Sequence, residues 1–168
     1  NGFALTCEAY RYFIRHNNLE TNIKYQLDRL EKSKNVNETI KKVGENIRNL
    51  IKESNFPNNL RDEIIKSYKL LSSEYNVSNL DVAVRSSANA EDLPDASFAG
   101  QQETYLNVKG TDNILVAIKN CYASLFTNRV ISYRISKNFD HTKVYMSVGV
   151  QKMVRSDLGS AGVAFSLD

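Results

Sequence analysis

Four stripes of apolar residues in the first half of the chain repeat every three or four positions, the spacing of one face of an α-helix. They are Tyr10, Phe13 and Ile14; Leu19, Ile23, Leu27 and Leu30; Ile40, Val43, Ile47 and Leu50; and Leu60, Ile64, Leu71 and Tyr75. Thr6 and Asn37 can cap the first and third helices, and Pro57 can open the fourth. The stripes stop before the polar segment 76–79, so residues 1–79 are expected to be mainly helical.

From about residue 80 the pattern changes to short alternating runs, which are typical of β-strands. Strands are predicted over 81–86, 103–108, 144–154 and 162–167, with a loop over 87–100, one long helix from 111 to about 137 and a turn over 155–160. Helices first and mixed elements afterwards favour an α+β domain with antiparallel strand pairs. Residues 80–168 are then the strand-rich part of one domain that spans 1–168.

Composition narrows the class of protein only slightly. The 168 residues are 42% hydrophobic and 24% charged, which is ordinary for a globular domain, and 168 residues suit one domain or slightly more. A net charge of +3 with scattered Lys and Arg does not indicate nucleic-acid binding. No apolar run approaches the ~18 residues of a membrane span.

Cys7 and Cys121 are far apart and form no CxxC pair, so a reducing cytoplasm is the simplest interpretation. The chain begins without Met and stops directly after a strand-like run. We therefore expect it to be a fragment of a longer protein.

Arg85 is the first candidate for chemistry. Alternation places Val82 and Val84 on one face of a strand and Arg85 on the other, followed by the small hydroxyl residues Ser86 and Ser87. A guanidinium can bind phosphate oxygens with two parallel hydrogen bonds, so this strand end suits a phosphate. A surface arginine that ends an ordinary strand explains the same pattern equally well.

The segment 88–100 that follows is rich in small residues and can fold over a ligand. It is also acidic through Glu91, Asp92 and Asp95, and carboxylates repel phosphate unless a metal ion lies between them. A solvated loop with turn-forming Asn and Asp residues is the alternative, and periodicity does not separate the two.

The long predicted helix contains two arginines with different expected positions. Its apolar stripe is Ile114, Ile118, Cys121, Tyr122, Leu125 and Phe126. At about 100° per residue, Arg129 falls in the middle of this stripe and Arg134 falls off it. A buried Arg129 requires an anion, because an unpaired buried charge is costly. That anion is either a structural carboxylate or a ligand phosphate.

The strand predicted over 144–154 has one apolar face and one face of small and polar residues. Gly149 and Gln151 lie on the second face, where they would suit a nucleotide, although a half-exposed sheet residue is the commoner explanation for Gln151. His16 and His141 show no metal-ligand spacing with the cysteines, and no phosphate-binding glycine loop is present. The residues alone therefore indicate an α+β domain with an anion site around Arg85 and Arg129.

Three motifs resemble the phosphoenolpyruvate synthase family, whose superfamily includes pyruvate phosphate dikinase and rifampicin phosphotransferase. They are VRSSANAEDLPDASFAGQQET at 84–104, ASLF at 123–126 followed by Arg129 and Tyr133-Arg134, and QKMVRSD at 151–157. The resemblance covers about half of the chain strongly. It implies part of an ATP-grasp-like nucleotide-binding domain that uses ATP and Mg²⁺. In the family this domain works with a phosphohistidine domain and a pyruvate-binding barrel.

The reaction that the resemblance implies converts ATP, pyruvate and water to AMP, phosphoenolpyruvate and phosphate through a phosphohistidine. Alternatives are the ATP domain of a rifampicin phosphotransferase or of a pyruvate phosphate dikinase, or a nucleotide-binding module without catalysis. The family's phosphate-binding lysine, acidic metal ligands, phosphohistidine and barrel do not occur in these 168 residues. The chain alone is therefore expected to hold neither catalytic residues nor metal ligands, and to be inactive.

Motif position assigns roles to individual residues. The resemblance implies that Arg85 holds nucleotide phosphates, that Gly100 and Thr104 line the cleft, and that Gln151 lies at the adenine side. The backbone of Lys152, Met153 and Val154 is expected to offer hydrogen bonds to the base. For Ser86, Arg129 and Arg134, a phosphate role and a structural role both stay open.

Overall fold

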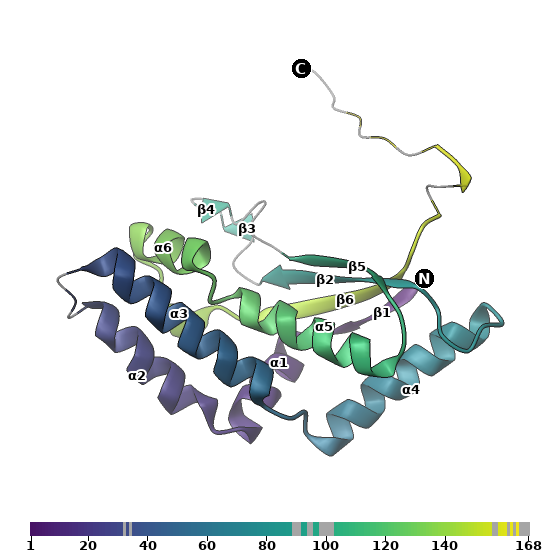
Figure 1. Cartoon of the computed structure of the whole chain (residues 1–168), viewed down its shortest axis with the longest axis horizontal. Helices are drawn as coiled ribbons and strands as arrows, with labels where there is room; N and C mark the ends of the chain where they lie inside the picture. Colours follow the sequence, from purple (N-terminus) through teal and green to yellow (C-terminus); the bar gives the residue numbers. More distant parts are fainter. Residues whose placement is uncertain are drawn as a thin grey trace.

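An antiparallel four-stranded sheet and six α-helices make up the described part of the chain in a computed structural model (Figure 1). The structure describes residues 1–31, 33, 35–88, 92–93, 96–97, 103–155, 158–160, 162 and 164. The helices are α1 (Cys7–His16), α2 (Leu19–Glu31), α3 (Val36–Glu53), α4 (Asn58–Glu74), α5 (Thr111–Ser124) and α6 (Asn128–Ser136). The α+β class expected from the order of elements is confirmed.

The four helices predicted from the apolar stripes are all present. Thr6 caps α1 by accepting a hydrogen bond from the Ala9 amide at 3.4 Å, and Pro57 directly precedes α4. In the described part of the chain, no helix is both long enough and apolar enough to cross a membrane.

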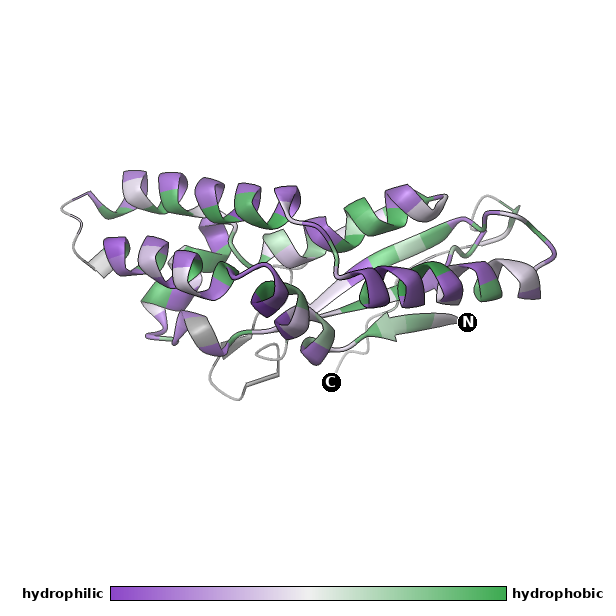
Figure 2. Ribbon diagram, turned by 90° about the horizontal axis from the view of Figure 1, so that it is seen from below, coloured by the Kyte–Doolittle hydropathy of each residue, from purple (hydrophilic) through white to green (hydrophobic). Residues whose placement is uncertain are grey.

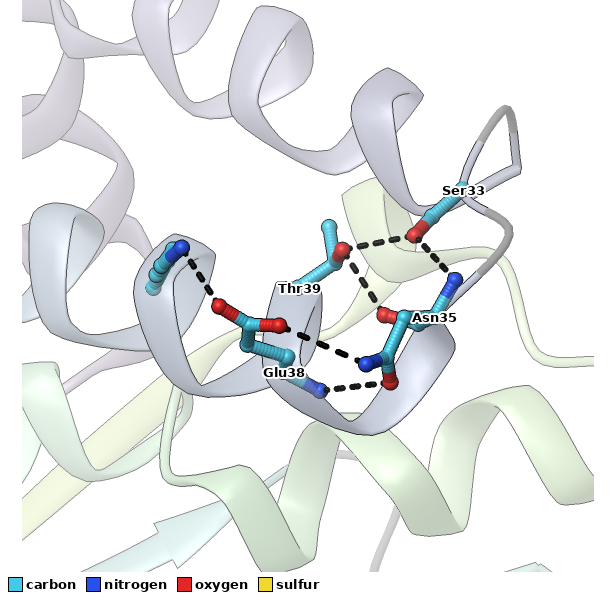
Figure 3. A network of polar contacts seen from close by, with 5 residues as sticks. Ser33, Asn35, Glu38 and Thr39 are labelled. Carbon is cyan, nitrogen blue, oxygen red and sulfur yellow. Dashed lines mark hydrogen bonds and ion pairs between the residues drawn. The ribbon is translucent and has the colours of Figure 1, made fainter.

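The third helix begins earlier than predicted, because Asn35 and not Asn37 is its cap. The Asn35 side chain accepts from the Glu38 amide at 3.4 Å, and its own amide group donates to the Glu38 carboxylate at 3.3 Å (Figure 3). Thr39 and Ser33 complete this network on the other side of the turn. Asn37 lies inside the helix, where its side chain is exposed.

The sheet has the strand order β1 (Gly2–Leu5), β6 (Met146–Lys152), β2 (Val82–Ala88) and β5 (Thr104–Val108). Sequence periodicity missed β1, because four residues are too few to show an alternation. Within the predicted loop 87–100, β2 continues to Ala88, and β3 (Asp92–Leu93) pairs with β4 (Ala96–Ser97). Of the strand predicted over 162–167, residues 162 and 164 belong to no strand, and the other four lie outside the described residues.

One face of this sheet is buried under helices. Val82, Val84, Val148 and Val150 point to that face and are fully buried. Helix α5 lies across β2, β5 and β6, while α1 packs against β6 and β1, and α4 packs against β1. Seen from the helical side, the helices alternate purple and green turns, whereas the strands behind them are mostly green (Figure 2). The opposite face of the sheet is left without a helix in the described residues.

The predicted long helix is two helices, and this break reverses the expected positions of its arginines. Helix α5 ends at Ser124, and Thr127 caps α6 by accepting from the Val130 amide at 3.3 Å. The non-helical residues between them change the helical phase. Arg129 is exposed and Arg134 is fully buried, so the prediction that Arg129 faces the core was wrong.

Candidate functional site

The helix-free face of the sheet brings three of the predicted site residues together. Arg85 lies on the central strand β2, directly opposite Thr104 on β5 and Gly149 on β6. Ala83, two residues before Arg85 on the same face, lies opposite Gln151. Residues directly opposite each other in an antiparallel pair have Cβ atoms about 5 Å apart. Arg85, Thr104 and Gln151 are therefore neighbours on one surface, which we call the outer face.

Arg85 is the charged group at the centre of the outer face. Its side chain is exposed, and it forms no ion pair with any described residue. Alternation along β2 explains its position, because Val84 and Ser86 on either side of it are buried in the opposite direction. The guanidinium is therefore held on a rigid strand with its donors available to a ligand.

Gly149 has no side chain, so the surface of the outer face is flat beside Arg85. A Cβ atom added at Gly149 would meet only the Arg85 carbonyl oxygen, at 4.0 Å, which is ordinary van der Waals contact. Its backbone dihedral φ is not positive either. The fold therefore does not require glycine here, whereas a ligand that lies flat on the sheet would.

Ser86 points to the buried face and holds the start of β5. Its hydroxyl donates to the Glu103 carbonyl at 3.0 Å and accepts from the Glu103 amide at 2.9 Å. The Ser86 amide also donates to the Glu103 carbonyl at 3.1 Å. Because these bonds fix the residue before Thr104, Ser86 positions Thr104 on the outer face from behind.

At the end of β6, two of the backbone amides expected to contact the base already donate hydrogen bonds within the protein. The Lys152 amide donates to the Asn1 carbonyl at 3.1 Å, and the Met153 amide donates to the Asp81 carbonyl at 3.0 Å. The Lys152 ammonium lies 3.9 Å from the centre of the Tyr75 ring, on the helical side. Val154 is 83% exposed, and its amide has no partner among the described residues.

Gly100 lies outside the described residues, as does most of the segment 88–100, so its expected place in the cleft stays a prediction. Arg129 and Arg134 lie on helix α6, outside the sheet, and this helix packs against α3. The structure thus does not bring these two arginines to the outer face.

Neither metal-ligand clusters nor reactive thiols stand out in the described part of the chain. No three His, Cys, Asp or Glu side chains there lie close enough together to hold a metal ion. Cys7 and Cys121 are free thiols, and burial raises the pKa of Cys121 to about 12, which keeps it protonated.

Comparison with known proteins identifies the family. Residues 1–168 match, over their whole length, the family described as pyruvate phosphate dikinase, AMP/ATP-binding domain. The chain belongs to this family. It is also 54% identical to the phosphoenolpyruvate synthases of Helicobacter pylori and Aquifex aeolicus, and 48% identical to that of Escherichia coli.

These matches cover 99–100% of this chain but only 19–21% of each synthase. The chain thus spans about a fifth of the length of the curated relatives it matches. The resemblance to the phosphoenolpyruvate synthase family seen in the sequence is confirmed over the whole chain.

Proposed function

We propose that the outer face of the sheet binds ATP and that the chain is the nucleotide-binding part of a phosphoenolpyruvate synthase. The observation that carries this proposal is the register that places exposed Arg85, Thr104 and Gln151 on one face of a domain whose family binds AMP or ATP. The ATP-grasp-like architecture implied by the sequence belongs to the same proposal.

Each residue of the outer face has a role that its chemistry allows. Arg85 binds phosphate oxygens through two parallel hydrogen bonds, and the Thr104 hydroxyl directly opposite donates to the same phosphate group. Gln151 lies two residue pairs further along the sheet, at the next position on the same face, and contacts the adenine side. The exposed Val154 amide offers a hydrogen bond to the base, because the Lys152 and Met153 amides are occupied. The family motif implies that Gly100 lines the same cleft.

The complete reaction converts ATP, pyruvate and water to AMP, phosphoenolpyruvate and phosphate through a phosphohistidine. The histidine and the pyruvate site belong to the rest of the parent protein, since the matched relatives are about five times longer than this chain. Mg²⁺ would neutralise phosphate charge during transfer. The family resemblance implies that its ligands lie outside these residues.

The parent-length protein is expected to form AMP and phosphoenolpyruvate in equal amounts from ATP and pyruvate. Chromatographic measurement of both products over time tests this, with a reaction lacking pyruvate as the control. Formation of ADP without AMP would contradict the proposal. Pyruvate-independent AMP formation that depends on a rifamycin would instead favour the antibiotic phosphotransferase.

Gly149→Val is expected to raise the KM for ATP about tenfold, because a branched side chain would stand where the nucleotide lies. A tenfold change corresponds to about 1.4 kcal/mol. Stability should change little, since space for a Cβ exists and valine favours strands. Ala4→Val is the matched control, because Ala4 pairs with Gly149 on the same face one strand away. An unchanged KM for ATP in Gly149→Val would show that the nucleotide does not lie over Gly149.

A further inference from the structure

Arg134 is a buried cation with most of its hydrogen-bonding capacity unused. It is 0% exposed, and its Nη2 donates to the Leu125 carbonyl at 2.6 Å. Its Nε and Nη1 atoms are buried without any hydrogen-bond partner, and no carboxylate pairs with it in the described part of the chain. Its guanidinium carbon lies 5.2 Å from the centre of the Phe126 ring. Unmade hydrogen bonds to a buried charge are costly, so these two nitrogen atoms favour a ligand that brings its own acceptors.

A cavity of about 610 Å³ adjoins this guanidinium, between α2, the start of α3, α6 and the 3-10 turn His141–Lys143. His141 lies in the same wall, and its Nδ1 is also buried without a partner. Two side chains with unused hydrogen-bonding nitrogen atoms therefore line the same cavity. The volume lies within the range of roughly 300–1,000 Å³ that small-molecule sites occupy.

The rest of the cavity wall is mixed. Its apolar side chains are Leu27, Leu30, Val36, Ile135 and Phe139. Its ionisable groups besides Arg134 and His141 are Lys24 and Asp28 from α2 and Asp140 beside the turn. Asp140 lies 3.7 Å from the Lys143 ammonium, so its carboxylate is already partly neutralised. The cationic pole at Arg134 and the apolar walls thus suit a molecule with an anionic head and an apolar body.

We propose that this cavity is a second ligand site, which binds a small organic phosphate or carboxylate with its anionic head at Arg134 and His141. An oxyanion offers acceptors to Nε and Nη1 in the parallel geometry that guanidinium groups prefer. Because no part of Arg134 is open to water, side chains of the cavity wall must shift for the head to reach it. Val36 and Ile135 are about 40% exposed at the cavity and are placed to contact the apolar body.

This site is separate from the outer face. None of the residues that line the cavity belongs to a strand, and Arg85, Thr104 and Gln151 are not among them. Helices α2, α3 and α6 lie together in the helical layer (Figure 1). The proposal therefore does not depend on nucleotide binding at the sheet.

Burial and the nearby Arg134 charge lower the pKa of His141 to about 4, so the imidazole is neutral at ordinary pH. An anion bound between the two side chains would favour the protonated form and raise this pKa by about one unit or more. Titration of the His141 ring by NMR, with and without ligand, thus gives a readout that a purely structural role would not move.

Calorimetry with phenyl phosphate as the probe tests the site, on the 168-residue chain and on the parent-length protein. Phenyl phosphate is expected to bind both at least tenfold more tightly than benzyl alcohol, its neutral counterpart. Val36→Trp should weaken binding about tenfold by filling the cavity, whereas Leu70→Trp, an exposed position on α4, should not. Because Arg85 is itself proposed to bind phosphate, only the part of the binding that Val36→Trp removes is assigned to the cavity, which separates this site from the outer face.

The proposal fails if phenyl phosphate binds no better than benzyl alcohol, or if Val36→Trp binds it like the wild type. It also fails if the short chain binds the probe and the parent-length protein does not, since a carboxylate from the rest of the parent then occupies the Arg134 pole. The proposal is supported if Arg134→Met no longer binds phenyl phosphate while its free energy of unfolding equals that of the wild type. If Arg134→Met does not fold, the result for Val36→Trp still decides the test.

Discussion

Arg85→Lys in the parent-length protein is expected to lower kcat/KM for ATP by ten- to a hundredfold or more. An ammonium group cannot reproduce the two parallel hydrogen bonds that a guanidinium makes to phosphate. Loss of one charge-assisted hydrogen bond, at about 1.5–3 kcal/mol, corresponds to a change of this size. The substitution should not change stability measurably, because Arg85 is exposed and pairs with no described residue.

Steady-state kinetics at varied ATP, together with thermal unfolding, separate these effects. Arg61→Lys is the matched control, since Arg61 is exposed on α4 and lies on no strand. A rise in KM alone would indicate that Arg85 binds the ground state, and a fall in kcat would indicate that it stabilises charge during transfer. If the activity of Arg85→Lys lies within twofold of the wild type, Arg85 does not bind phosphate and is an ordinary surface residue.

The outer face could be predicted from the sequence because strand alternation is a strictly local property. Once residues 82–88 and 146–152 form strands, Arg85 and Gln151 must point away from the valines beside them. Their meeting on one face depends on the pairing of β2 with β6, which periodicity does not reveal. The family motifs supplied that link, since they assign both residues to the same nucleotide.

The break between α5 and α6 shows where periodicity fails. The prediction treated residues 111–137 as one continuous helix. Leu125 and Phe126 are not helical, so the helical phase of α5 does not continue into α6. A local signal was present, because Thr127 can cap a new helix and does so. The break is also held by a long-range contact, in which Arg48 of α3 donates to the Phe126 carbonyl at 2.6 Å. No pattern within residues 111–137 contains that contact.

The same error concealed Arg134. A fully buried arginine on the helix face that looked polar is found only when tertiary packing is known. Its burial results from the new phase of α6, which also turns Val130 and Ile131 into the core. The sequence motif that contains Arg129 and Arg134 does not say which of them is buried, whereas the structure shows that it is Arg134.

Arg134→Ala is expected to lower the free energy of unfolding by about 2–5 kcal/mol, while Arg129→Ala should change it by no more than about 0.5 kcal/mol. Truncating Arg134 empties a fully buried volume, removes its contact with the Phe126 ring and leaves the Leu125 carbonyl without a donor. Arg129 is exposed, so its loss removes no packed volume. Urea unfolding of the 168-residue chain measures both changes.

Arg134→Met separates packing from charge at the same position. Methionine keeps much of the buried volume and removes a charge that has two unused donors, and such replacements are often tolerated or stabilising. We expect it to be more stable than Arg134→Ala by at least about 1 kcal/mol, although the Leu125 carbonyl still loses its hydrogen bond. If Arg134→Met were as damaging as Arg134→Ala, the charge itself would be required for folding, and an anion would already have to lie beside it. Equal effects of Arg134→Ala and Arg129→Ala would mean that the helical phase after Thr127 differs from the one described.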